Sequence, residues 1–179
     1  MINHNPFITL TVYIIKEIKV MKFMKSNSNI TARVISDTVK YNGSNANQLM
    51  DNNSCSVLAL AEAFEISYDQ AYTYAKDVWG RLKRKGVITG RIIDTFNSGL
   101  KVLDKKIVDS KPITKYRQPN GKIVNRRMRI STFIKEHPKG TYYILVKGHA
   151  LVIKNGVMYD VKSFADRFSR PINYAWQVK

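Results

Sequence analysis

The sequence predicts an α+β fold in which N-terminal helices pack on a C-terminal antiparallel sheet. Two helical patterns come first, at about 54–64 and from Ser67 onward, and strand patterns occupy residues 141–178. A run of helices followed by a run of strands is typical of the α+β class. The chain of 179 residues has the length of one domain with a sizeable hydrophobic core.

We expect residues 1–43 to form an N-terminal extension and residues 44–179 to form the domain. The apolar run 7–15 is rich in β-branched residues, which favours a strand. It is shorter than the roughly 20 residues of a membrane-spanning helix, and it lacks a signal peptide's basic leader and cleavage site. We therefore expect no membrane span. Residues 30–41 are rich in Thr and Val, and we expect them to form an extended arm. Three methionines are candidate translation starts: Met1, Met21 and Met24.

Two helices are expected in the first half of the domain. The first, at about 54–64, is apolar on most sides, which is typical of a buried helix. The second begins at Ser67, which forms a capping-box pattern with Gln70. Apolar and aromatic residues at spacings of three and four continue through Leu82, so we expect an amphipathic helix that ends near Gly86.

Glycines and prolines interrupt the middle of the chain, from about 87 to 130. We expect only short helical turns there, and a hairpin tip or loop at 118–121. Ser131 or Thr132 is expected to cap a short helix. Four strands are then expected, at 141–147, 149–154, 157–161 and near 174–178.

The chain is strongly basic: 30 Lys and Arg against 13 Asp and Glu give a net charge of +17. Such an excess favours anionic partners, with nucleic acid first and acidic proteins or membrane surfaces next. The densest basic runs, 81–85 and 126–129, match no known nucleic-acid-binding motif. We expect the run 81–85 to be a solvated helix end. The simpler alternative is that the charge mainly confers solubility.

Cys55 is the only cysteine, so the chain has no internal disulfide. A free thiol fits a reducing cytoplasm, and no Cys/His cluster has zinc-ligand spacing. We therefore expect neither a metal nor any other cofactor. Of the three histidines, only His149 has a structured apolar setting.

Cys55 and His149 form a candidate catalytic pair. The first turn of a helix directs free N–H groups and a positive dipole end at the sulfur, which favours the thiolate. A two-residue turn at Asn155-Gly156 places His149 and Asp160 on one face of the sheet, where the carboxylate can orient the imidazole. A register shift of one residue would put them on opposite faces.

The Cys55 backbone N–H and an upstream side-chain amide would form an oxyanion hole, with Asn53 and Gln48 as candidates. For each of these residues a purely structural role, without any part in catalysis, stays open. Cys55 can be a small buried hydrophobe, Asn53 a plain helix cap, and Asp160 a strand end.

Together these residues resemble the papain-like cysteine peptidase superfamily, and more narrowly its small bacteriophage-encoded members. The resemblance covers about residues 50–165. Its motifs are Asn53-Ser54-Cys55, the helical segments 57–63 and 67–75, Gly140-Thr141-Tyr142, Gly148-His149-Ala150 and Tyr159-Asp160.

The resemblance implies a papain-like fold and a triad of Cys55, His149 and Asp160. It implies hydrolysis of peptide or isopeptide bonds in a protein or peptide substrate. It also implies a phage protein in the host cytoplasm or the virion. Members of the superfamily usually carry a Gln about six residues before the Cys, whereas here Leu49 holds that place and Gln48 precedes it.

Three functions stay open at this point. The first is a cysteine hydrolase. The second is a deamidase or transglutaminase-like acyl transferase that uses the same residues on a glutamine amide. The third is a catalytically inactive basic protein that binds nucleic acid or an acidic host protein.

Overall fold

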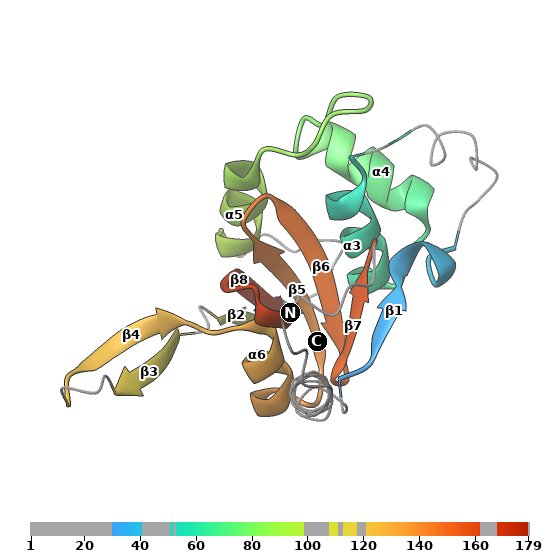
Figure 1. The fold of residues 1–179 in the computed structure, drawn as a ribbon. Coiled ribbons are helices and arrows are strands. Elements are labelled where there is room, and N and C mark those ends of the chain that lie inside the picture. Colours follow the sequence, from blue (N-terminus) through green and yellow to red (C-terminus); the bar gives the residue numbers. More distant parts are fainter. Residues whose placement is uncertain are drawn as a thin grey trace, which may run out of the picture. The chain divides into compact units, whose positions relative to one another are not determined.

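The computed structural model describes residues 30–40, 51, 53–98, 108–110, 113–117, 121–161 and 168–178. Contacts within the chain group Thr31–Lys179 as one compact unit (Figure 1). The strand expected at 7–15 and the oxyanion candidate Gln48 lie outside the described residues.

A six-stranded sheet forms the centre of this unit, in the order β1-β7-β6-β5-β8-β2. Every neighbouring pair is antiparallel except β1 and β7, which run parallel. The α+β class is therefore confirmed, and the four C-terminal strands pair antiparallel as predicted, but the sheet as a whole is mixed because β1 joins it in parallel. The strands are β1 (Ala32–Val34), β2 (Val108–Ser110), β5 (Thr141–Val146), β6 (His149–Lys154), β7 (Val157–Asp160) and β8 (Ile172–Gln177).

The sheet includes part of the segment that the sequence analysis assigned to an extension. Ala32 pairs with Met158 and Val34 with Asp160, so β1 forms an edge of the sheet. The short 3₁₀ helix η1 (Ile35–Asp37) follows, and Ile35 is buried in the core. Residues 31–40 are therefore part of the domain, and the boundary predicted at residue 43 does not match the fold.

Helix α3 (Cys55–Phe64) packs on β6 and β5, with α4 (Tyr68–Asp77) against its other side (Figure 1). All its residues from Ser56 to Phe64 are buried, as its apolar composition predicts. The capping box at the start of α4 is also confirmed, since Ser67 and Gln70 exchange hydrogen bonds through side chain and backbone.

Helix α4 ends earlier than the sequence predicts. It stops at Asp77, and the periodic apolar positions beyond it include Leu82, which is 69% exposed. Gly80 adopts a φ of +60°, which glycine tolerates without steric cost, and the Arg81 N–H then bonds back to the Ala75 carbonyl at 2.9 Å. The predicted end near Gly86 is therefore wrong, because the chain turns at Gly80.

Two further helices and a hairpin complete the described part. Helix α5 (Thr89–Asn97) is longer than the short turns expected there. Helix α6 (Ile130–Glu136) has Arg129 at its N-cap and no side-chain cap, so neither Ser131 nor Thr132 acts as one. Strands β3 (Ile113–Arg117) and β4 (Ile123–Arg127) pair across the hairpin tip expected at 118–121. No described helix has the length and apolar composition needed to cross a bilayer.

Candidate active site

Cys55 is the first residue of α3, as predicted, and its side chain is only partly buried. Ser54 occupies the N-cap position but makes no side-chain cap bond. The Ser54 side chain therefore does not occupy the free backbone N–H groups of the first turn, and the positive end of the helix dipole lies at Cys55. This setting favours the thiolate over the thiol.

The β6–β7 hairpin has the register that the two-residue turn predicts. Lys154 pairs with Val157 and Val152 pairs with Tyr159. His149 Nε2 lies 2.6 Å from Asp160 Oδ1, so the two side chains share one face of the sheet. The Asp160 side chain is fully buried, and the Val161 N–H donates to the same oxygen at 2.6 Å. The carboxylate therefore has a fixed position against the imidazole.

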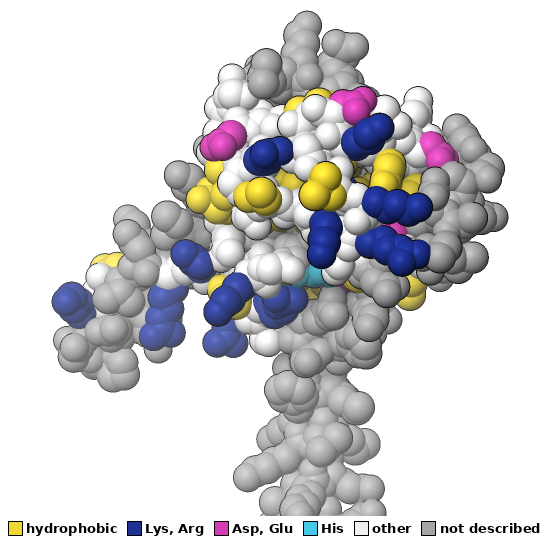
Figure 2. All heavy atoms as spheres, turned by 90° about the horizontal axis from the view of Figure 1, so that it is seen from above, with side chains coloured by type: hydrophobic (Ala, Val, Ile, Leu, Met, Phe, Trp, Pro, Cys, Tyr) yellow, Lys and Arg dark blue, Asp and Glu magenta, His cyan; other side chains and the backbone are white. Residues whose placement is uncertain are grey.

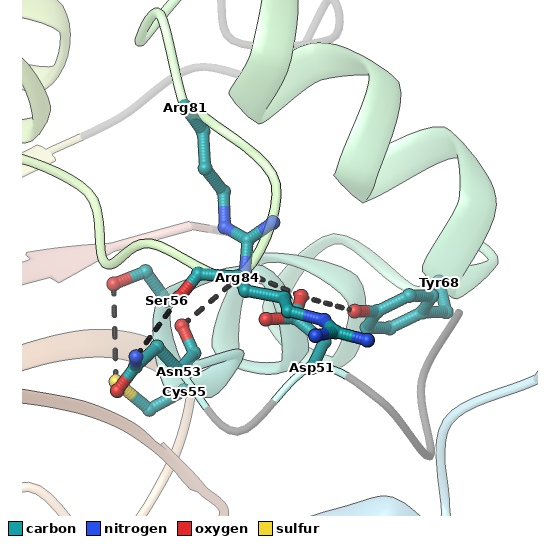
Figure 3. Close-up of polar contacts among 7 residues, drawn as sticks. All are labelled: Asp51, Asn53, Cys55, Ser56, Tyr68, Arg81 and Arg84. Carbon is teal, nitrogen blue, oxygen red and sulfur yellow. Dashed lines mark hydrogen bonds and ion pairs between the residues drawn. The ribbon is translucent and has the colours of Figure 1, made fainter. Parts of the chain in front are cut away.

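The structure also brings His149 to Cys55. The His149 side chain and the Ala150 backbone N–H lie near enough to the Cys55 thiol to lower its pKa, and the sulfur lies 4.0 Å from Ser56 Oγ (Figure 3). Because His149 Nε2 faces Asp160, Nδ1 is the ring nitrogen left for the thiol. Packing of α3 on β6 therefore joins Cys55, His149 and Asp160 in one line of contacts.

The two members of this pair have pKa values shifted in opposite directions. Burial raises the pKa of Cys55, but the hydrogen bond to His149, the Ala150 N–H and the imidazolium charge outweigh it, so that pKa lies below its ordinary value. Burial lowers the pKa of His149, but its bonds to Asp160 and Cys55 raise it to about 9. Each charge stabilises the other, so a thiolate–imidazolium pair is favoured over the neutral pair.

Tyr143 supports the start of α3 from the sheet. This residue of β5 is fully buried, and its hydroxyl donates to the Ser56 carbonyl at 3.3 Å. Burial and the nearby Cys55 raise the pKa of Tyr143 well above its usual value, so the phenol stays neutral and able to donate. The contact fixes the residue next to Cys55 against the strand that leads to His149.

Asn53 has a different partner from the one that the oxyanion hypothesis requires. Its side chain is exposed, and Nδ2 donates to the Arg84 carbonyl at 3.0 Å (Figure 3). The amide therefore links the residues before α3 to the loop between α4 and α5. A role for Asn53 in oxyanion binding stays a prediction.

A buried network holds the segment just before Cys55 in place (Figure 3). Arg81 Nη2 forms an ion pair with Asp51 Oδ2, and the two side chains are 1% and 4% exposed. The Tyr68 hydroxyl donates to the same carboxylate oxygen at 3.0 Å, and Arg81 also reaches the Asn53 carbonyl at 3.4 Å. The guanidinium lies 5.0 Å from the centre of the Tyr72 ring.

Sequence reasoning missed this network. The basic run 81–85 was expected to be a solvated helix end, which is wrong for Arg81. Asp51 lies in a polar, turn-prone stretch that gave no sign of burial. Gly80 was the one local sign that the helix ends before Arg81, because helices often end at a glycine.

No protein-family model, curated protein or solved structure matches this chain. Among the described residues, no group of three or more His, Cys, Asp or Glu side chains is placed to hold a metal ion. The interpretation of the site therefore depends on its own geometry.

We predict that Arg81→Met lowers the free energy of unfolding by about 3–5 kcal/mol, because it leaves the buried Asp51 carboxylate without its cation. Urea denaturation followed by tryptophan fluorescence measures the change. Lys83→Met is the control: Lys83 is exposed two residues away, and its loss should change stability by no more than about 0.5 kcal/mol. Similar losses for both variants would contradict a structural role for the buried pair.

Proposed function

We propose that this protein is a cysteine hydrolase of papain-like type, with Cys55 as nucleophile, His149 as general base and acid, and Asp160 as the group that orients His149. The observation that carries the proposal is the position of Cys55 at the first residue of α3, close to an imidazole that bonds to Asp160 at 2.6 Å, with opposite pKa shifts of Cys55 and His149. A structural thiol needs neither feature.

The proposed reaction begins with attack of the Cys55 thiolate on the carbonyl carbon of an amide bond. The His149 imidazolium, through Nδ1, donates its proton to the leaving amine, and an acyl-thioester forms on the sulfur. Neutral His149 then takes a proton from water, which attacks the thioester and releases the acid. Asp160 holds the ring in place through both steps, because its carboxylate accepts from Nε2.

The order of elements supports the papain-like assignment. A helix with the nucleophile at its first residue packs on an antiparallel sheet, and that sheet supplies the base and the carboxylate from one hairpin. The relation to small bacteriophage-encoded members of the superfamily stays a prediction. So does the oxyanion hole, for which the Cys55 backbone N–H is the first donor we propose.

An acyl transferase would use the same thioester, with an amine instead of water as the acceptor. The two reactions share Cys55, His149 and Asp160 and differ only in what reaches the thioester. A fluorescent primary amine added to the reaction separates them, because a transferase incorporates it into the product.

We predict that alkylation of Cys55 by iodoacetamide has a pH midpoint below the ordinary thiol value of about 8.5. In His149→Ala the midpoint should rise to 8.5 or above, because burial of the sulfur remains while the imidazolium is lost. Alkylation rates from pH 4 to pH 10, followed by mass spectrometry, measure both values. His137→Ala is the control, since His137 lies at the end of α6, and should leave the midpoint unchanged. An ordinary midpoint in the native protein would contradict the proposal.

The activity itself is tested with a peptide library digested by the native protein and by Cys55→Ala. We expect cleavage only with the native protein. Asp160→Asn should lower kcat/KM by about 10²–10⁴-fold, because the amide no longer favours the required imidazole tautomer. Absence of both cleavage and amine incorporation that depend on Cys55 would refute the enzymatic proposal.

A further inference from the structure

Exposed basic side chains flank the candidate active site on two sides. Both α3 and β6 begin at the upper end in Figure 1, and the loop between α4 and α5 passes over the same end. Figure 2 shows the face seen from there: Lys and Arg side chains run across its middle, and Asp and Glu side chains lie toward its margins.

The first basic side is the loop after α4, where Lys83, Arg84 and Lys85 are exposed. Its position is fixed by the hydrogen bond from Asn53 to the Arg84 carbonyl at 3.0 Å. Asn53 is two residues before Cys55, and two residues of extended chain span at most about 7 Å. This loop therefore lies beside the nucleophile.

The second basic side is the turn between β5 and β6. Lys147 is exposed there and lies two residues before His149. Arg170 Nη2 donates to the Lys147 carbonyl at 2.7 Å, which brings a second cation to the turn. Lys147 and Arg170 therefore lie on the imidazole side of the site.

Three acidic groups of the described residues are paired with cations other than those of these two sides. Asp51 pairs with Arg81, and Asp160 with His149. A further ion pair joins Lys154 to Glu65, just beyond the opposite end of α3. None of the three involves Lys83, Arg84, Lys85 or Lys147.

We propose that this site selects peptide segments with Asp or Glu on both sides of the bond that is cleaved. The inference rests on the proposed hydrolase function and adds a substrate class to it. A surface with charges of one sign attracts oppositely charged substrates and raises their association rates. The Debye length is about 8 Å at physiological salt, so these charges act on the parts of a bound peptide that lie along this face.

The chemistry of the face favours an acidic peptide over a nucleic acid. Single-stranded nucleic acid is bound by exposed aromatic rings on which its bases stack. The large exposed hydrophobic side chains among the described residues are all aliphatic: Val78, Leu82, Ile88 and Ile123. Leu82 and Ile88 belong to the same loop as Arg84, so the loop offers cationic and aliphatic contacts to a peptide.

The test compares two alkylating reagents on the intact protein: iodoacetate, which is anionic, and iodoacetamide, which is neutral. We expect the iodoacetate-to-iodoacetamide rate ratio at Cys55 to exceed that of 2-mercaptoethanol and to fall as salt is added. Arg84→Glu with Lys147→Glu should lower the ratio about tenfold or more, and a change in the thiolate fraction cancels in the ratio because both reagents react with the same thiolate.

The matched control is Lys76→Glu with Lys135→Glu, which makes the same change in net charge at exposed positions on α4 and α6. It should leave the ratio near the native value. Peptides with Asp or Glu around the cleaved bond should then be hydrolysed faster than their Asn and Gln counterparts, and only with Arg84 and Lys147 present.

The outcomes distinguish failure of the hydrolase proposal from failure of the inference about acidic substrates. A thiol that neither reagent modifies below pH 8.5 refutes the hydrolase, and the substrate inference with it. A reactive thiol whose rate ratio is the same in the native protein, the test variant and the control overturns the substrate inference alone. Salt-dependent binding of single-stranded DNA without discrimination between acidic and neutral peptides also overturns it.

Discussion

The contact between the Cys55 thiol and the His149 imidazole is the interaction on which the candidate site depends. The two residues come from distant parts of the chain, so only the packing of α3 on β6 brings them together. Tyr143 fixes the first turn of α3 from the sheet side through the Ser56 carbonyl. Arg81 fixes the preceding segment from the loop side through Asp51 and the Asn53 carbonyl. The start of the helix is therefore held on both sides.

The pair also makes folding stability depend on pH. The folded pKa of His149, about 9, lies above the unfolded value of about 6.5, so its stabilising contribution is complete below about pH 6.5 and is lost as the pH rises through 9. The folded pKa of Cys55 is lowered, so its contribution is present above the ordinary thiol pKa and is lost as the pH falls through the folded value. The charged pair is favoured between the two folded values.

Local patterns in the sequence predicted the parts of the site that depend on local geometry. The start of α3 followed from an apolar run behind a polar turn, and the shared face of His149 and Asp160 followed from a two-residue turn. The sequence did not predict the buried Arg81–Asp51 pair or the edge strand β1, because each depends on a distant partner. Arg81 is buried only because Asp51, thirty residues earlier, meets it, and β1 is a strand only because β7 pairs with it. Neither the burial of Arg81 nor the pairing of β1 produces a hydrophobic periodicity in the local sequence.

The most direct measurement of the Cys55–His149 contact is an NMR titration of the His149 ring in the native protein and in Cys55→Ala. We expect a native midpoint near pH 9 that falls clearly when the thiolate is removed, because one of the two groups that favour the imidazolium is lost. A native midpoint at or below about 6.5, unchanged in Cys55→Ala, would mean that the two side chains do not interact, and it would contradict the account.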